Sequence, residues 1–295
     1  MKTGIFVLCL VLLGTFAHAA EDRPADATFQ FGSRWSFELD PDDQPYPDYL
    51  ADPRRMRLGI SLAGVDSEIP ETSAGRAILD IGTRYTLFKI RPDPEGDYAL
   101  SLDIMGGVFM QFDLGNQLDN VGWEGIYGLG IVFAQNDHMA ARIGYRHLSS
   151  HIGDEYIEKT GRERIGYTRD DLTLGLSYWP REDWMVYVEP RWAFNLGDAD
   201  GMKELAGEAG VQYEGPRKFW NGNAAFYAGL HVQAYQESDW KPGVSFQSGL
   251  QIRRGDDGAN IRLGLEGYTG RAILGEYALD FDESYLLCGF MLDFY

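Results

Sequence analysis

Apolar and polar residues alternate over long runs, and this period of two constrains the fold more than any other feature of the chain. In residues 98–112 an apolar residue or a glycine holds every second position, while Ser101, Asp103 and Gln111 lie between them. A strand with one apolar and one polar face has this pattern. It recurs in segments 77–87, 127–133, 172–178, 186–194, 226–232, 244–252 and 261–265.

Such runs, counted from Met56 onward, number about twelve, and bacterial single-chain membrane barrels have an even number of strands. The positions between the apolar residues carry charges, such as Glu124, Arg191 and Glu266, which suit a wet or salt-bridged lumen. The sequence therefore predicts an all-β fold over residues 56–295. We expect an antiparallel up-and-down transmembrane β-barrel of about twelve strands in a bacterial outer membrane.

The linkers between the runs predict the orientation of the barrel. If the first strand runs outward, short linkers fall on the periplasmic side and longer ones outside, as membrane barrels show. The short linkers are 135–137, 180–183 and 255–258, and the longer ones are 65–75, 151–165 and 271–283. The last strand alternates up to Phe294. This ending resembles the terminal aromatic signal that the barrel-assembly machinery recognises, so that machinery is an expected partner.

A soluble β-sandwich or a lipocalin-like barrel would also alternate, but its apolar residues would face inward. Aromatic residues gather near the expected strand ends, as in interfacial girdles. They include Trp35, Tyr178, Trp179, Trp184, Tyr213 and Trp220. The aromatic positions therefore favour the membrane barrel. The formal net charge of −19 argues against a nucleic-acid partner, which would need a basic stripe.

Residues 1–19 have the features of a cleaved secretory signal peptide. Lys2 supplies a short positive region, and segment 5–13 is almost wholly apolar. Ala17 and Ala19 then give the small-x-small pattern that a signal peptidase cuts. Its removal would leave Cys288 as the one cysteine, which excludes an intramolecular disulfide.

Residues 20–55 are expected to form an irregular N-terminal arm, because five prolines and many aspartates interrupt any regular pattern. Phe29, Phe31, Trp35 and Phe37 indicate one strand within it. The sequence leaves open whether the arm plugs the lumen or lies in the periplasm.

One hairpin carries residue types that could do chemistry. On the strand that contains Ile143 and Tyr145, parity places His147 and Ser149 on the same lipid-facing side. Asp170 has the lipid-facing parity on the following strand, so the hairpin could set Asp170 beside His147. A serine hydroxyl becomes nucleophilic when a base removes its proton, and a third group fixes the tautomer of that base. At the outer rim such a trio would meet the acyl ester of a membrane lipid.

The order and parity of these residues resemble outer-membrane phospholipase A and, more loosely, the lipid A deacylase barrels. Those families carry a His-x-Ser on an outward-facing strand and a polar residue at the start of the next. The resemblance implies His147 as base, Ser149 as nucleophile and Asp170 as the orienting group, with a phospholipid or lipopolysaccharide as substrate. Where those families typically continue with Asn-Gly, this chain has Ser150 and His151.

Over its whole length the chain looks like an uncharacterised family of bacterial outer-membrane proteins with a domain of unknown function. A metal site is a second local hypothesis. Asp154 and Glu155 could hold calcium through carboxylate oxygens, as the phospholipase resemblance suggests, with His147 and His151 nearby. No other cofactor is expected.

Three functions remain open from the sequence. The first is a lipid acyl-ester hydrolase, the second a small channel that uses the lumen charges, and the third a structural or adhesive surface protein. A barrel this narrow more often fills its interior with paired charges, because a sizeable pore needs about 16–18 strands. A monomer or a homodimer is compatible with each function.

Overall fold

A computed structural model of the chain describes residues 27–31, 35–41, 43–93, 96–135, 138–253 and 260–293. The expected signal peptide at 1–19, the turn at 255–258 and the terminal Phe294 lie outside the described residues. Within the described part, no helix has the length and apolarity needed to span a bilayer.

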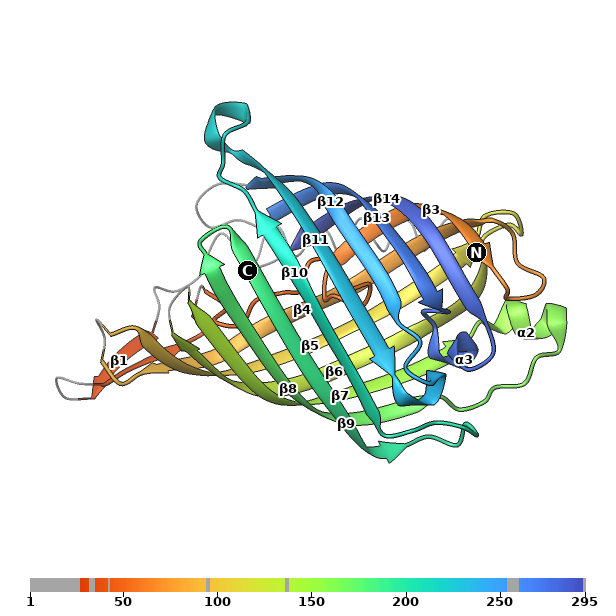
Figure 1. The fold of residues 1–295 in the computed structure, drawn as a ribbon, viewed down its shortest axis with the longest axis horizontal. Coiled ribbons are helices and arrows are strands. Elements are labelled where there is room, and N and C mark those ends of the chain that lie inside the picture. The colour runs from red at the N-terminus through yellow and green to blue at the C-terminus, as the bar shows by residue number, and fades with distance from the viewer. Residues whose placement is uncertain are drawn as a thin grey trace.

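Twelve strands, β3 to β14, form a closed antiparallel barrel within the described residues (Figure 1). Each strand pairs with its sequence neighbour, and β14 pairs with β3 to close the ring. The strands are β3 (Leu58–Ser67), β4 (Gly75–Arg91), β5 (Tyr98–Asp113), β6 (Asp119–Gln135), β7 (Met139–Ile152), β8 (Thr168–Arg181), β9 (Trp184–Leu196), β10 (Leu205–Glu214), β11 (Ala224–Tyr235), β12 (Gly243–Arg253), β13 (Asn260–Arg271) and β14 (Asp282–Asp293). The expected fold class and strand number are confirmed.

The apolar face of the sheet points outward. Leu100, Leu174 and Leu263 are 42%, 49% and 44% exposed, whereas Asp103 and Arg262 are almost fully buried in the interior. A soluble sandwich or lipocalin would have the opposite arrangement. Because lipid offers no hydrogen bonds, a membrane-spanning sheet must pair every strand edge, and the closed ring does so. The protein is therefore an outer-membrane-type β-barrel whose outer surface contacts membrane lipid.

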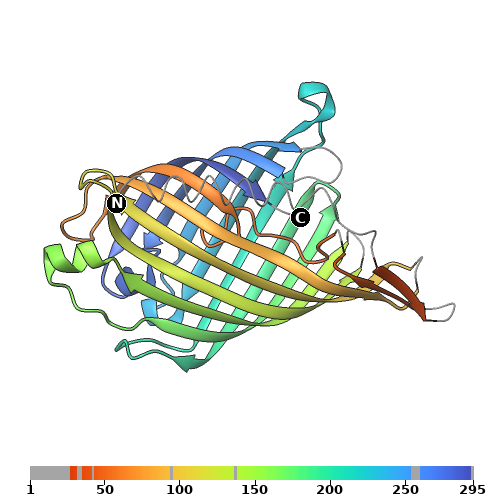
Figure 2. The same cartoon turned by 180° about the vertical axis from the view of Figure 1, so that it is seen from behind.

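The N-terminal arm begins with a β-hairpin outside the barrel. The sequence indicated one strand here, but the structure has two, β1 (Ala27–Phe31) and β2 (Trp35–Leu39), which pair with each other. β2 also pairs with the end of β4, where Ser36 lies opposite Arg91. The hairpin therefore extends the sheet beyond the ring at the end opposite α2 (Asp154–Thr160) (Figure 2).

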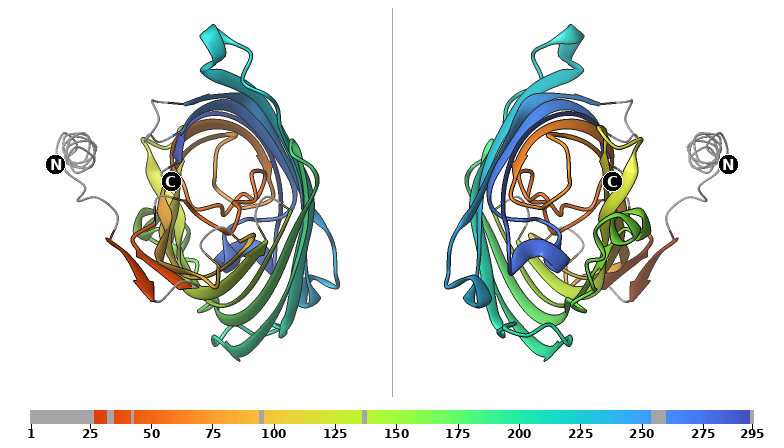
Figure 3. Two further views of the ribbon diagram at one scale, coloured as in Figure 1. Left: turned by 90° about the vertical axis from the view of Figure 1, so that its left-hand side faces the viewer. Right: turned by 90° about the vertical axis from the view of Figure 1, so that its right-hand side faces the viewer.

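After the hairpin, the arm turns back and fills the lumen. Figure 3 shows this segment coiled inside the ring of strands. Tyr46, Tyr49 and Leu50 are buried there. The ring of Tyr49 stacks on Tyr187 of β9 at 3.7 Å, and the Leu50 amide donates to Gln212 of β10 at 3.0 Å. The structure thus decides the alternative that the sequence left open: the arm is a plug.

Buried ion pairs hold the arm to the barrel wall. Arg54 donates from Nε and Nη2 to the two carboxylate oxygens of Glu124, at 2.6 and 3.1 Å. Arg57 pairs with both Asp80 and Glu266, at 2.6 and 2.9 Å. Charges removed from water need such partners, because an unpaired buried charge is strongly destabilising. The interior positions that the sequence predicted to be polar are therefore occupied by a paired network.

At the end that carries α2, the loop between β13 and β14 folds into the mouth of the barrel. It contains α3 (Gly275–Ala278), while the β7–β8 loop contains α2. The amide of Gly275 donates to Glu124 at 2.7 Å, and Tyr277 donates its hydroxyl proton to the Val121 carbonyl at 2.7 Å. Burial raises the pKa of Tyr277, so the phenol stays protonated as a donor. Two 3-10 turns, η1 (Trp220–Gly222) and η2 (Gln236–Ser238), complete the described loops.

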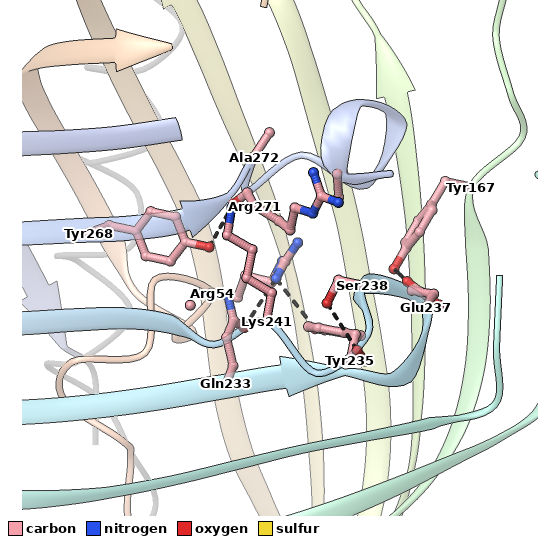
Figure 4. A pocket seen from close by; sticks show the side chains of 12 residues that line it. Arg54, Tyr167, Gln233, Tyr235, Glu237, Ser238, Lys241, Tyr268, Arg271 and Ala272 are labelled. Atoms are coloured by element: carbon pink, nitrogen blue, oxygen red, sulfur yellow. Dashed lines mark hydrogen bonds between the residues drawn. The ribbon is translucent and has the colours of Figure 1, made fainter. Parts of the chain in front are cut away.

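Two small cavities lie between the arm and the wall in the described part. One has a volume of about 30 Å³ and is lined by Arg54, Tyr167, Gln233 and Tyr235 among others (Figure 4). A second, of about 20 Å³, lies beside Arg57. Spaces of this size hold one or two water molecules. Around these two cavities, side chains of the arm pack against the wall.

Candidate functional site

The candidate residues lie on the outer face of β6, β7 and β8, toward the end that carries α2. His147 of β7 lies directly opposite Asp170 of β8 on one side and opposite Tyr127 of β6 on the other. Side chains directly opposite each other in an antiparallel pair are close neighbours on one face. The pairing register therefore brings together a histidine and a carboxylate that are distant in sequence.

Asp170 is held by three hydrogen bonds. Its Oδ1 accepts from the hydroxyl of Tyr145 at 2.6 Å and lies 2.7 Å from Nδ1 of His147, and its Oδ2 accepts from the amide of Asn195 at 2.6 Å. Less than a fifth of the side chains of His147 and Asp170 is exposed. Two neutral donors and one imidazole thus fix the carboxylate in place.

The Asp170 contact determines which nitrogen of His147 carries the proton. A carboxylate only accepts, so in the neutral ring the proton lies on Nδ1 and the lone pair is on Nε2. The ring of Tyr127 stacks on the imidazole with centroids 4.5 Å apart. Within the described part, His147 therefore has a fixed orientation and an Nε2 lone pair that accepts no hydrogen bond, as a general base requires.

Ser149 shares the outer face with His147 and lies opposite Gly125 of β6. A Cβ atom at Gly125 would lie 3.4 Å from the Ser149 hydroxyl oxygen and 3.5 Å from the ring of Trp123. The absent side chain leaves a notch beside the hydroxyl. Tyr127 lies on one side of this Gly125 notch and Trp123 on the other. Within the described residues, no hydrogen bond joins Ser149 to His147.

The two residues that follow Ser149 separate onto opposite faces. Ser150 points into the lumen, where its hydroxyl oxygen accepts from the Glu276 amide at 3.1 Å, so it lies away from the candidate site. His151 lies on the outer face and stacks on Trp123 at 4.1 Å. His151 therefore belongs to the wall of the notch.

Asp154 and Glu155 occupy the first turn of α2. Asp154 pairs with Arg164 at 3.2 Å, and its side chain is 86% exposed. Among the described residues, neither carboxylate is part of a group of three metal-ligating side chains. In the part of the chain that the structure describes, no third His, Cys, Asp or Glu side chain joins them, and calcium binding by Asp154 and Glu155 stays a prediction.

The sequence did not single out three residues that complete the site. Tyr127 and Tyr145 have outward parity, but so do many girdle aromatics, and parity alone does not distinguish them. Asn195 reaches Asp170 because the β8–β9 pairing shifts by one residue: Asp170 lies opposite Asn195, whereas Asp171 lies opposite Ala193. Such a bulge changes which face a residue occupies, and the sequence carries no clear signal of it.

Three solved structures show what the fold is similar to. Outer membrane phospholipase A from Escherichia coli, as an active-site mutant, has a TM-score of 0.54 and 14% identity, covering 85% of this chain and 94% of that one. The phospholipase of Salmonella typhi, a dimer with bound calcium, has a TM-score of 0.53 and 14% identity, covering 80% and 90%. The KdgM porin has a TM-score of 0.42 and 10% identity, covering 81% and 100%.

At these identities the likeness concerns the fold alone. No curated protein matches the chain. The model of one protein family, described as a protein of unknown function (DUF1207), matches residues 41–292, which include the lumen-filling arm and nearly all of the barrel. The chain therefore belongs to the DUF1207 family, and it is an outer-membrane β-barrel.

Proposed function

We propose that this barrel hydrolyses acyl ester bonds of outer-membrane lipids, with Ser149 as nucleophile, His147 as general base and Asp170 as the residue that orients the base. The observation that carries the proposal is the 2.7 Å contact between His147 Nδ1 and Asp170 Oδ1 on the lipid-facing surface. A carboxylate that binds Nδ1–H of a histidine stabilises the imidazolium that forms during acyl transfer.

In the proposed reaction, Nε2 of His147 takes the proton of the Ser149 hydroxyl while the oxygen attacks the ester carbonyl carbon. The imidazolium then gives that proton to the alkoxide oxygen of the leaving alcohol, and the acyl group stays on Ser149. Water, deprotonated by the same nitrogen, then attacks the acyl carbonyl and breaks its bond to Ser149 Oγ; the imidazolium returns the proton to Oγ, and a fatty acid is released. The Ser149 hydroxyl must turn toward His147 when the ester binds, and catalytic hydrogen bonds commonly tighten only in the substrate complex.

The surroundings of Ser149 suit a lipid ester better than a soluble one. The hydroxyl lies on the outer face beside the Gly125 notch, which has aromatic side chains on both sides. Trp and Tyr are enriched at the level where acyl chains meet headgroups, which is also the depth of an acyl ester. A lipid could therefore be attacked without leaving the membrane.

The packed lumen gives less support to a channel. The arm, the α3 loop and the buried ion pairs fill the described interior, and the small cavities in Figure 4 and beside Arg57 do not resemble an ion path. A structural or adhesive role would not require a hydrogen-bonded contact between Asp170 and His147 on the outer face. The hydrolase is therefore the function that the geometry supports best.

The test uses the purified full chain in detergent with a phospholipid and a lipid A fraction as separate substrates. Wild type is expected to release fatty acid from one of them, and Ser149→Ala is expected to lower kcat by at least about 10³-fold, as loss of a serine nucleophile does. A fluorophosphonate should label Ser149, with the adduct located by mass spectrometry.

Ser150→Ala is the matched control, because Ser150 is the adjacent serine on the opposite face of the same strand. It should retain both activity and labelling. Equal activity in wild type and Ser149→Ala, or a label on another serine, would remove the proposed nucleophile.

A further inference from the structure

A second group of chemically capable side chains lies inside the lumen, far from the outer face. Asp52 of the arm, Glu208 of β10 and His231 of β11 each point one ligand atom toward the others, and these atoms all lie within 4.8 Å of one another. Glu208 and His231 are buried and Asp52 is partly buried. The group therefore joins the arm to two strands of the wall.

His231 has a nitrogen without a hydrogen-bond partner. Its Nδ1 lies 2.8 Å from the hydroxyl oxygen of Tyr187, whereas its Nε2 is buried and forms no hydrogen bond with any residue that the structure describes. The side chain is 0% exposed. If Nδ1 donates its proton to Tyr187, Nε2 carries a lone pair directed toward the carboxylates. Metal-binding histidines commonly donate their second ring N–H to an outer partner in this way.

The spacing of the atoms suits one small cation. Nε2 of His231 and Oε2 of Glu208 are 3.9 Å apart. Ligand atoms that each lie about 2.1 Å from a zinc ion are about 3.4 Å apart in tetrahedral geometry. Arg191 also contacts Oε2 of Glu208, and such an outer hydrogen bond orients a carboxylate ligand. The three side chains would therefore have to close by about an ångström to reach this spacing.

Carboxylates in this part of the lumen share their guanidinium partners. Arg191 pairs with both Glu189 and Glu208, and Arg169 pairs with both Asp171 and Glu237. Buried charge is stable only when it is compensated. A divalent cation held by Asp52, Glu208 and His231 would add to that compensation.

We propose that Asp52, Glu208 and His231 bind one divalent transition-metal ion of the zinc type and that this ion fixes the arm in the lumen. One imidazole nitrogen with two carboxylate oxygens is a donor set for such an ion, whereas calcium prefers oxygen ligands alone. The cavity in Figure 4 is lined by Arg54 and Gln233, each two residues along the chain from a proposed ligand.

The test is zinc titration of the folded full chain, without a polyhistidine tag and after treatment with a chelator. Calorimetry should show one Zn²⁺ per chain. His231→Gln and Asp52→Asn should each lower the affinity by at least about 100-fold, since even outer partners of a metal site contribute 10–100-fold. Hydrogen exchange in residues 43–57 should slow when Zn²⁺ is added, because the arm would then be anchored.

His138→Gln is the matched control, since His138 is an exposed histidine outside the lumen, and it should bind Zn²⁺ like wild type. If His231→Gln does not fold, Tyr187→Phe keeps all three ligands and should weaken binding about tenfold. Two results would overturn the proposal: no saturable Zn²⁺ binding by wild type, or wild-type affinity in the variants of the ligands.

Discussion

Nδ1 of His147 and Oδ1 of Asp170 lie 2.7 Å apart across the β7–β8 pair, although 23 residues separate them in the chain. The contact lies on the outside of the barrel, where a charged or polar pair has no role in filling the lumen. Tyr145 and Asn195 add two more hydrogen bonds to the same carboxylate. A pair fixed this firmly on a lipid-facing surface is the basis of the proposed hydrolase.

Asp170→Asn should lower kcat by about 10²–10⁴-fold with little change in KM. An amide can donate to Nδ1 and so favours the tautomer in which Nε2 carries the proton, which disables the base; the corresponding change in a serine protease costs about 10⁴-fold. Steady-state kinetics of fatty-acid release from the preferred lipid would measure both parameters.

Asn195→Ala is a milder variant that tests the same carboxylate. It removes one hydrogen bond from Oδ2 of Asp170 but leaves the contact with His147, so a smaller loss, of about tenfold, is expected from a positioning residue. Equal rates for wild type and Asp170→Asn would show that the carboxylate does not orient the base.

Filling the Gly125 notch should impair lipid turnover without disturbing His147. A valine at Gly125 places methyl groups against the Ser149 hydroxyl and the ring of Trp123, because even a Cβ lies 3.4 and 3.5 Å from them. We expect Gly125→Val to lower kcat/KM by at least about tenfold, and Gly125→Ala to have a smaller effect, since its Cβ makes ordinary contacts.

Gly106→Val is the control, because a Cβ at that outward glycine of β5 has just one neighbour within 4 Å, the Ile126 carbonyl oxygen at 3.9 Å. Both valine variants should fold and insert alike, as judged by gel mobility without heating. Normal kinetics in Gly125→Val would mean that the ester does not approach Ser149 from this side.

The fold could be predicted because one physical rule governs most of the chain. The lipid-facing side of every strand must be apolar, so the period of two specifies both the strands and the face that each residue occupies. The alternating pattern predicted that Leu174 faces lipid and that Glu124 faces the lumen, and the structure confirms both positions. The number of strands could also be predicted, because each alternating run forms one strand and a turn separates it from the next.

Parity and hairpin pairing also predicted that His147 would lie beside Asp170, but the rest of the site depended on irregular features. Asn195 reaches Asp170 because of a β-bulge, and the arm has no regular alternation of apolar and polar residues. Its path is set by individual contacts, such as Tyr49 on Tyr187, which local patterns do not encode. The roles of Ser149, His147 and Asp170 in catalysis stay predictions.

Arg54→Met should destabilise the barrel by about 3–5 kcal/mol, since it leaves Glu124 buried without its cationic partner. Arg54 also donates to the carbonyl oxygen of Ile273, so the change loosens the arm and the outer loop together. Denaturant unfolding in detergent, followed by tryptophan fluorescence, measures the difference. Arg164→Met, which removes an exposed pair with Asp154, should cost at most about 1 kcal/mol.

A lumen filled by the arm predicts that wild type carries no steady ion current in planar bilayers. Ion passage would require the arm to leave the wall, which breaks the pair between Arg54 and Glu124. Arg54→Met should therefore produce brief openings that wild type lacks, whereas Arg164→Met should behave like wild type. Steady conductance in wild type would contradict the plug and would favour a channel over a hydrolase, because the lumen charges would then line an open path.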